Sequence, residues 1–190
     1  MTFTKEVLTN YHSNEFGTFE NCNLYHLHDN KQIIGQFIIS EKVAFISTID
    51  FKLRIDIKNH FFKASEYLIF ELPSDIQIGY YTIPSWTIGW KEIGSLELDN
   101  NKYFCTRQKA EIQSNIFKKS TWGHYKLVVR NNKTEIIYKL KVETEWCEAP
   151  DSEFRNAQGE ISFNKEDTKL ILAGMFFIER MLNIIDNNSY

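Results

Sequence analysis

Basic side chains gather in one segment of a chain that is otherwise slightly acidic. The 190 residues carry a formal net charge of −3, yet residues 102–146 hold ten Lys or Arg and four Asp or Glu side chains. Lysine and arginine bind phosphate groups through charge-assisted hydrogen bonds. This segment is therefore the first candidate for a binding site. The small net charge argues against nucleic-acid binding, for which a broadly basic surface is expected.

A hairpin across Asn131 and Asn132 places these basic side chains on one face of a sheet. Asparagine tolerates the left-handed backbone of a tight two-residue turn. The predicted cross-strand pairs are Leu127 with Ile136, Tyr125 with Tyr138, Trp122 with Lys141 and His124 with Lys139. Apolar residues then share the inner face, because side chains alternate along each strand. The candidate ligand-binding residues on the outer face are Trp122, His124, Lys126, Arg130, Lys139 and Lys141.

Two interpretations of this outer face remain open. A cationic surface with an aromatic residue suits phosphate groups at a membrane surface or on a ligand. Alternatively, the lysines keep a solvated strand soluble and Trp122 packs against a lysine stem. Residues 52–58 supply a second basic candidate, in which Asp56 lies among Lys52, Arg54 and Lys58.

Two histidines form the nearest approach to a metal site. His26 and His28 flank one residue, so on a strand both imidazoles point the same way. Partners for a metal would come from His12, Asp29 or Glu20. No third ligand stands at a diagnostic spacing, so we treat the pair as polar surface residues and expect no metal or cofactor.

No pattern in the chain predicts an enzyme. There is no glycine-rich phosphate loop and no Gly-x-Ser-x-Gly sequence. Cys105 or Cys147 would need a nearby base to act as a nucleophile, and the sequence does not place one. Together with Cys22, the cysteines are odd in number and far apart, which indicates reduced thiols in a cytoplasmic protein.

The C-terminal segment predicts a helix without a solvated face. The apolar run Leu170–Ile178 goes right round a helix that we expect over about residues 165–186, with Asn164 as N-cap. A membrane span needs about 20 apolar residues. Here Glu179 and Arg180 follow after nine, which argues against a span. The remaining possibility is a helix that strands enclose.

The rest of the chain predicts those strands. Residues 1–24 are irregular in pattern and suggest a first strand or a covering arm. Short runs rich in Ile, Phe, Tyr, Val and Thr then follow, and these residues suit a pleated surface. The predicted strands are Ile33–Ile39, Val43–Ile49, Phe51–Ile57, Tyr67–Leu72, Ile76–Ile83, Trp86–Leu98, Tyr103–Arg107, Glu111–Phe117, Trp122–Arg130, Thr134–Trp146 and Ile161–Phe163. Strands followed by one apolar helix indicate an antiparallel barrel with the helix inside.

This arrangement resembles the tubby C-terminal-like superfamily, which includes the phospholipid scramblases and the LURP-one-related proteins. The resemblance rests on the helix Leu170–Ile185 and on the strand that begins Thr121-Trp122-Gly123-His124. It implies a closed, mainly β, antiparallel barrel of about 10–12 strands around a hydrophobic C-terminal helix. Tubby proteins bind phosphoinositide headgroups through basic residues on the barrel. A cysteine-rich palmitoylation segment and a scramblase-type calcium loop are not visible here, so activity does not follow from the resemblance.

We therefore expect residues 1–190 to form one tubby-like domain that is cytoplasmic, not transmembrane and not an enzyme. The expected function is a binding module for anionic phospholipid headgroups or a protein partner, with no nucleic acid. The alternative is a lipocalin-like or helix-grip carrier of a small hydrophobic ligand, which requires the helix to lie outside the barrel.

Overall fold

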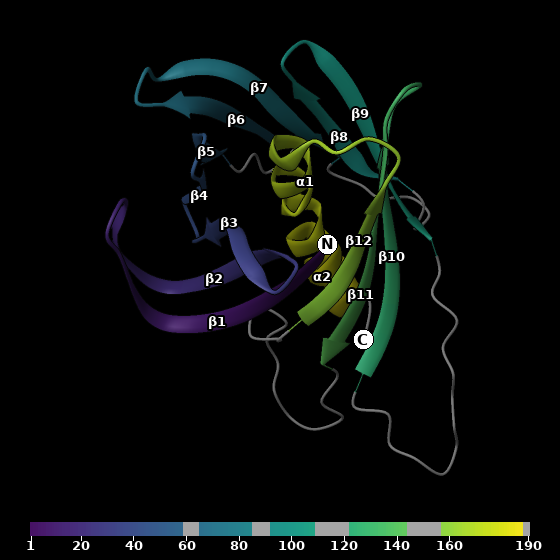
Figure 1. Cartoon of the computed structure of the whole chain (residues 1–190), viewed down its shortest axis with the longest axis horizontal. Helices are drawn as coiled ribbons and strands as arrows, with labels where there is room; N and C mark the ends of the chain where they lie inside the picture. The colour runs from purple at the N-terminus through teal and green to yellow at the C-terminus, as the bar shows by residue number, and fades with distance from the viewer. Residues whose placement is uncertain (59–64, 85–91, 109–121, 144–156, 188–190) are drawn as a thin grey trace.

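Twelve antiparallel strands close into one barrel (Figure 1). The computed structural model describes residues 1–58, 65–84, 92–108, 122–143 and 157–187. Each strand pairs with its neighbours in chain order, and β1 pairs with β12 to complete the ring. The strands are β1 Thr2–Ser13, β2 Gly17–Asp29, β3 Gln32–Ile39, β4 Val43–Thr48, β5 Lys52–Lys58, β6 Ser65–Leu72, β7 Ile76–Ile83, β8 Glu92–Leu98, β9 Asn101–Gln108, β10 Trp122–Arg130, β11 Glu135–Glu143 and β12 Ala157–Phe163. The predicted closed, mainly β barrel is thus confirmed.

Most strands begin and end close to the predicted residues because their side chains alternate. In β5, Leu53 and Ile55 are buried, while Lys52 and Arg54 are partly exposed on the outer face. The predicted strand Trp86–Leu98 is described only from Glu92, and Glu111–Phe117 lies outside the described residues. Ile49, which we assigned to a strand, instead lies in the turn after β4 and is 98% exposed.

The apolar C-terminal segment forms two consecutive helices, α1 (Thr168–Gly174) and α2 (Phe176–Asn187). The predicted N-cap was wrong: the side chain of Asp167 accepts the backbone N–H of Leu170 at 2.9 Å. Asn164 instead uses its side chain to bond the backbone of the β10–β11 turn. Gly174, at the end of α1, lies against Tyr138, since a Cβ there would overlap the tyrosine hydroxyl.

Strands on all sides of the barrel contact α1, so the helix occupies the interior. β3, β7 and β11 divide the ring of strands into thirds. From β3, Gly35 faces the side chain of Leu172, and a Cβ at Gly35 would lie 2.7 Å from it. The hydroxyl groups of Tyr81 on β7 and Tyr138 on β11 donate to the carbonyls of Ala173 and Ile171, at 2.8 and 2.7 Å. The helix at the centre of Figure 1 is therefore enclosed as predicted.

The helix is buried around its whole circumference. Every residue from Leu170 to Glu179 is buried, which accounts for the absence of a solvated stripe. Phe176 stacks on Tyr81 with ring centroids 4.4 Å apart and lies beside Tyr67 at 4.9 Å. Within the described ranges, neither helix has both the length and the apolar character of a membrane-spanning helix.

Residues 1–24 form two long strands, which the irregular pattern of the sequence had concealed. The tip of the β1–β2 hairpin packs on the outside of the barrel wall, where Phe16 stacks on Phe45 with ring centroids 4.5 Å apart. Glu15 at this tip accepts a hydrogen bond from Ser47 at 2.7 Å and pairs with Lys52 at 3.0 Å. Because the hairpin contributes to a second apolar cluster outside the barrel, apolar residues occur on both of its faces and obscure the alternation.

We predict that Leu172→Lys prevents folding or lowers the free energy of unfolding by about 3–5 kcal/mol, because it buries an unpaired charge. Ile49→Lys is the control, since the same side chain is introduced at a position that is 98% exposed. Soluble yield and urea denaturation measure both variants. Equal stability of the two would contradict an enclosed helix.

Candidate functional site

The hairpin of β10 and β11 turns through four residues rather than the two that we predicted. The backbone N–H of Asn131 donates to Thr134 at 2.9 Å, and its side-chain oxygen accepts the N–H groups of Lys133 and Thr134, each at 2.8 Å. The first pair of the ladder is therefore Arg130 with Glu135. An asparagine side chain that bonds the backbone two residues on stabilises such a longer turn.

This turn shifts the predicted register by two residues. The observed pairs are Trp122 with Glu143, His124 with Lys141, Tyr125 with Leu140, Lys126 with Lys139 and Leu127 with Tyr138. Each of the four predicted pairs was therefore wrong, because the β10 residue pairs with a different residue of β11. A shift of two residues leaves every side chain on its predicted face, because side chains alternate with a period of two.

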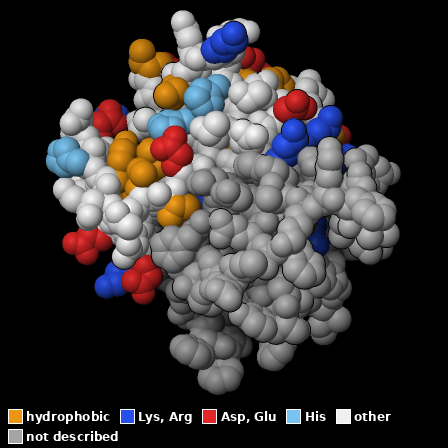
Figure 2. Space-filling model, turned by 90° about the horizontal axis from the view of Figure 1, so that it is seen from below, with side chains coloured by type: hydrophobic (Ala, Val, Ile, Leu, Met, Phe, Trp, Pro, Cys, Tyr) orange, Lys and Arg blue, Asp and Glu red, His pale blue; other side chains and the backbone are white. Residues whose placement is uncertain are grey.

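The basic candidates lie together on the outer face of this hairpin. Lys139, Lys141 and Arg130 are exposed, and Lys126 is partly exposed beside Lys139. The backbones of Trp122 and His124 are paired in the same ladder, but their side chains lie outside the described part of the structure. In the view from below, Lys and Arg side chains lie at several places on the described surface, and an apolar patch with acidic side chains lies on its left (Figure 2).

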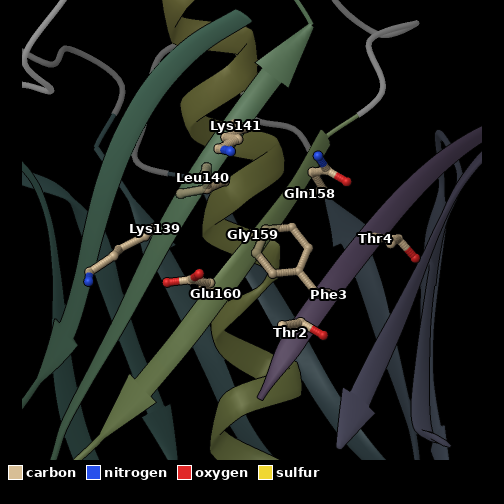
Figure 3. A pocket seen from close by; sticks show the side chains of 9 residues that line it. All are labelled: Thr2, Phe3, Thr4, Lys139, Leu140, Lys141, Gln158, Gly159 and Glu160. Carbon is tan, nitrogen blue, oxygen red and sulfur yellow. The ribbon is translucent and has the colours of Figure 1, made fainter. Parts of the chain in front are cut away.

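A hollow of about 480 Å³ lies where β11, β12 and β1 meet (Figure 3). Its volume falls within the range of small-molecule sites. Figure 3 shows Lys139 and Lys141 on β11 and Gly159 on β12, and the side chain of Lys139 extends away from β12. The residues that line it are Thr2, Phe3, Thr4, Lys139, Leu140, Lys141, Gln158, Gly159 and Glu160.

The strand register explains which polar groups meet in the hollow. Lys139 lies opposite Glu160, and Lys141 lies opposite Gln158. On the other side of β12, Glu160 pairs with Thr2, and Gln158 pairs with Thr4. Two adjacent rows of polar side chains therefore cross the three strands, each with a lysine at its β11 end.

The lysines of the hollow have no carboxylate partner within the described ranges. Among these residues, none of Lys126, Arg130, Lys139 and Lys141 makes an ion pair, although Glu160 also lines the hollow. The second basic candidate differs. Lys52 pairs with Glu15 at 3.0 Å, and Arg54 pairs with Asp56 and Asp75 at 2.9 and 2.8 Å. Lys58 has a side chain outside the described part. Of the two basic candidates, only the one on β10 and β11 therefore lacks an ion pair among the described residues.

Four polar residues of the hollow were missed by sequence reasoning: Thr2, Thr4, Gln158 and Glu160. The signal that was available is the alternation Thr2, Thr4, Glu6 in the N-terminal segment. It became informative only once β1 was seen to pair with β12, because these strands come from opposite ends of the chain.

The two histidines continue the polar rows beyond β1. Thr2 pairs with His28 and Thr4 with His26, and their imidazole rings lie 6.2 Å apart on the same face, as predicted. The side chains of Thr4 and His28 are hydrogen-bonded at 3.2 Å. His12 instead bonds Thr18 at 3.1 Å. Among the described residues, no group of three or more His, Cys, Asp or Glu could hold a metal ion.

The described cysteines do not offer a reactive thiolate. Cys22 and Cys105 are both free and buried, and Cys147 lies outside the described residues. Burial raises the pKa of the Cys105 thiol well above its ordinary value. A buried thiol in apolar surroundings is inert, since only the thiolate is a strong nucleophile.

Comparison with known proteins identifies no relative: no family model, curated protein or solved structure matches this chain.

We predict that His26 is neutral at physiological pH. Burial lowers its pKa from the ordinary value of 6.5, His28 lowers it further, and the charge of Glu6 partly opposes both effects. The folded chain therefore binds fewer protons at this site than the unfolded chain, so its contribution to stability falls as the pH drops through 6.5. An NMR titration should give a midpoint below 6.5.

Glu6→Gln should lower the His26 midpoint further, because it removes the one nearby charge that raises the pKa. Glu41→Gln, at an exposed position in the turn before β4, is the control and should leave the midpoint unchanged. A midpoint at or above 6.5 in the unmodified chain would show that burial does not dominate at His26.

Proposed function

We propose that this chain is a non-enzymatic binding module that recognises anionic phospholipid headgroups on the outer face of its barrel. The observation that carries the proposal is the hollow between β11, β12 and β1, which Lys139 and Lys141 line without a carboxylate partner among the described residues. Two ammonium groups that border a concave surface, with no ion pair to any described residue, provide the charge that a phosphate group needs.

The other polar groups of the hollow suit the remainder of a sugar-phosphate headgroup. Thr2, Thr4 and Gln158 supply hydroxyl and amide groups that donate and accept hydrogen bonds. Glu160 is acceptor-only when ionised, so it would accept from a sugar hydroxyl and disfavour a second phosphate near it. A headgroup that combines phosphate with hydroxyl groups, such as a phosphoinositide, fits this mixture better than a bare anion.

The filled interior of the barrel supports a site on the outside. A carrier of a hydrophobic ligand requires an open lumen and a helix on the exterior, but α1 and its neighbours fill the interior with buried side chains. The resemblance to tubby-like barrels, in which basic residues on the barrel bind phosphoinositides, favours the same interpretation. A cytoplasmic location would place the module beside an anionic membrane leaflet.

The first test is co-sedimentation with liposomes that contain a phosphoinositide, compared with neutral liposomes, at low and physiological salt. The unmodified chain should pellet with anionic vesicles only, and less at the higher salt, because screening weakens charge attraction. Each lysine near an anionic surface contributes about 1 kcal/mol, so Lys139→Glu/Lys141→Glu should weaken binding by roughly tenfold or more.

The matched control is Lys31→Glu/Lys42→Glu, which changes the net charge equally at exposed lysines in the turns that flank β3. Binding lost equally in both double variants would mean that overall charge, rather than the hollow, governs attraction. Absence of pelleting at either salt would contradict the lipid proposal and leave a protein partner as the role to test. Pelleting with neutral vesicles would contradict an enclosed apolar helix.

A further inference from the structure

A cluster of polar side chains lies inside the barrel, where the surrounding core is apolar. Glu179 of α2 is 5% exposed, and Lys5 of β1 is 2% exposed. Asn23 and Tyr25 of β2 complete the cluster around the Glu179 carboxylate. It lies away from the hollow, since Lys5 points inward whereas the neighbouring Thr4 lines the outer hollow.

The two carboxylate oxygens of Glu179 contact the amine of Lys5 and the carboxamide of Asn23. The Nζ of Lys5 lies 3.2 Å from Oε1 of Glu179, and the Nδ2 of Asn23 donates to Oε2 at 3.1 Å. The hydroxyl of Tyr25 also donates to Oε1. Lys5 lies opposite Tyr25, and Asn23 is two residues away from Tyr25 on the same strand. Lys5 and Asn23 are therefore diagonal neighbours on the inner face, within reach of a long side chain.

The hydrogen-bonding groups of this cluster are not all satisfied by the ion pair between Lys5 and Glu179. Within the described part of the chain, the Nζ of Lys5 and the Oδ1 of Asn23 are buried and lack a hydrogen-bond partner. Leaving a buried polar group unpaired destabilises the folded chain, and a charged group does so more strongly. Condensation of the amine with the amide would remove the ammonium charge altogether.

We propose that Lys5 and Asn23 condense to form an intramolecular isopeptide bond, with Glu179 as the catalytic acid and base. Glu179 accepts a proton from Lys5, which leaves a neutral amine. The Nζ of that amine attacks Cγ of Asn23 and forms a C–N bond. The bond from Cγ to Nδ2 then breaks as Glu179 returns its proton to the leaving nitrogen and takes the second proton from Nζ, so that Glu179 ends protonated. The products are a secondary amide and one molecule of ammonia, with no change in oxidation state.

The surroundings favour this chemistry in two ways. The barrel holds both reactants in place, so that the reaction is intramolecular. The Tyr25 hydroxyl orients the carboxylate through its hydrogen bond to Oε1. The product would join β1 covalently to β2, next to the closure of the ring between β1 and β12.

The mass of the intact purified chain tests the proposal. The expected mass is about 17 Da below the sequence mass, which corresponds to one ammonia. Asn23→Ala should restore the sequence mass while it leaves the Lys5–Glu179 pair in place. Asn23→Asp should lose about 18 Da as water and reach the same final mass as the unmodified chain, because both yield the same amide.

Proteolysis distinguishes this bond from a succinimide at an asparagine, which also loses ammonia. Trypsin would no longer cut after Lys5, and a Glu-specific protease would release residues 1–6 joined to a peptide that begins at Asn21. The full sequence mass with normal cleavage after Lys5 would overturn the proposal. A loss of ammonia that persists in Asn23→Ala would overturn it too, because the reacting amide would then lie elsewhere. Neither result depends on whether the hollow binds lipid.

Discussion

The architecture depends on a helix that has no solvent-exposed face over residues 170–179. A helix whose apolar residues cover its whole circumference is stable only if protein surrounds it, and a closed ring of strands is the simplest way to provide that without exposed sheet edges. The tyrosines of the wall then add polar anchors. The hydroxyls of Tyr81 and Tyr138 donate to the helix carbonyls of Ala173 and Ile171. Packing and hydrogen bonding therefore place the helix in one position.

Filling the interior moves any binding function to the outer wall. The inner faces of the strands are committed to the core, so only outward side chains and turns remain free to vary without loss of stability. Some basic residues of the described wall are compensated by nearby carboxylates, as Arg54 is by Asp56 and Asp75. The β11–β12–β1 region differs, because its lysines border a hollow and have no such partner within the described ranges.

The interior polar cluster is the exception to this division. Glu179 ends the apolar run of the helix, and Lys5 meets it from β1 in a position that an apolar residue would ordinarily occupy. Burying a charged pair costs several kcal/mol per ion before its attraction is counted, so such a pair is a poor means of stabilising a barrel. Its presence is better explained by chemistry or by specificity of strand position than by packing.

The sequence alone determined the class of fold, because hydrophobic periodicity directly reflects which side chains must avoid water. The apolar run 170–178 required enclosure, and the alternation placed Leu53 and Ile55 of β5 and Leu127 and Val129 of β10 on the inner face, where they are buried. Partners across strands could not be determined in this way. The β10–β11 register depends on a turn whose length the Asn131 side chain sets, and the hollow and the Lys5–Asn23–Glu179 cluster join segments far apart in the chain. Only closure of the barrel brings those segments together, since local periodicity carries no information about which distant strand lies alongside.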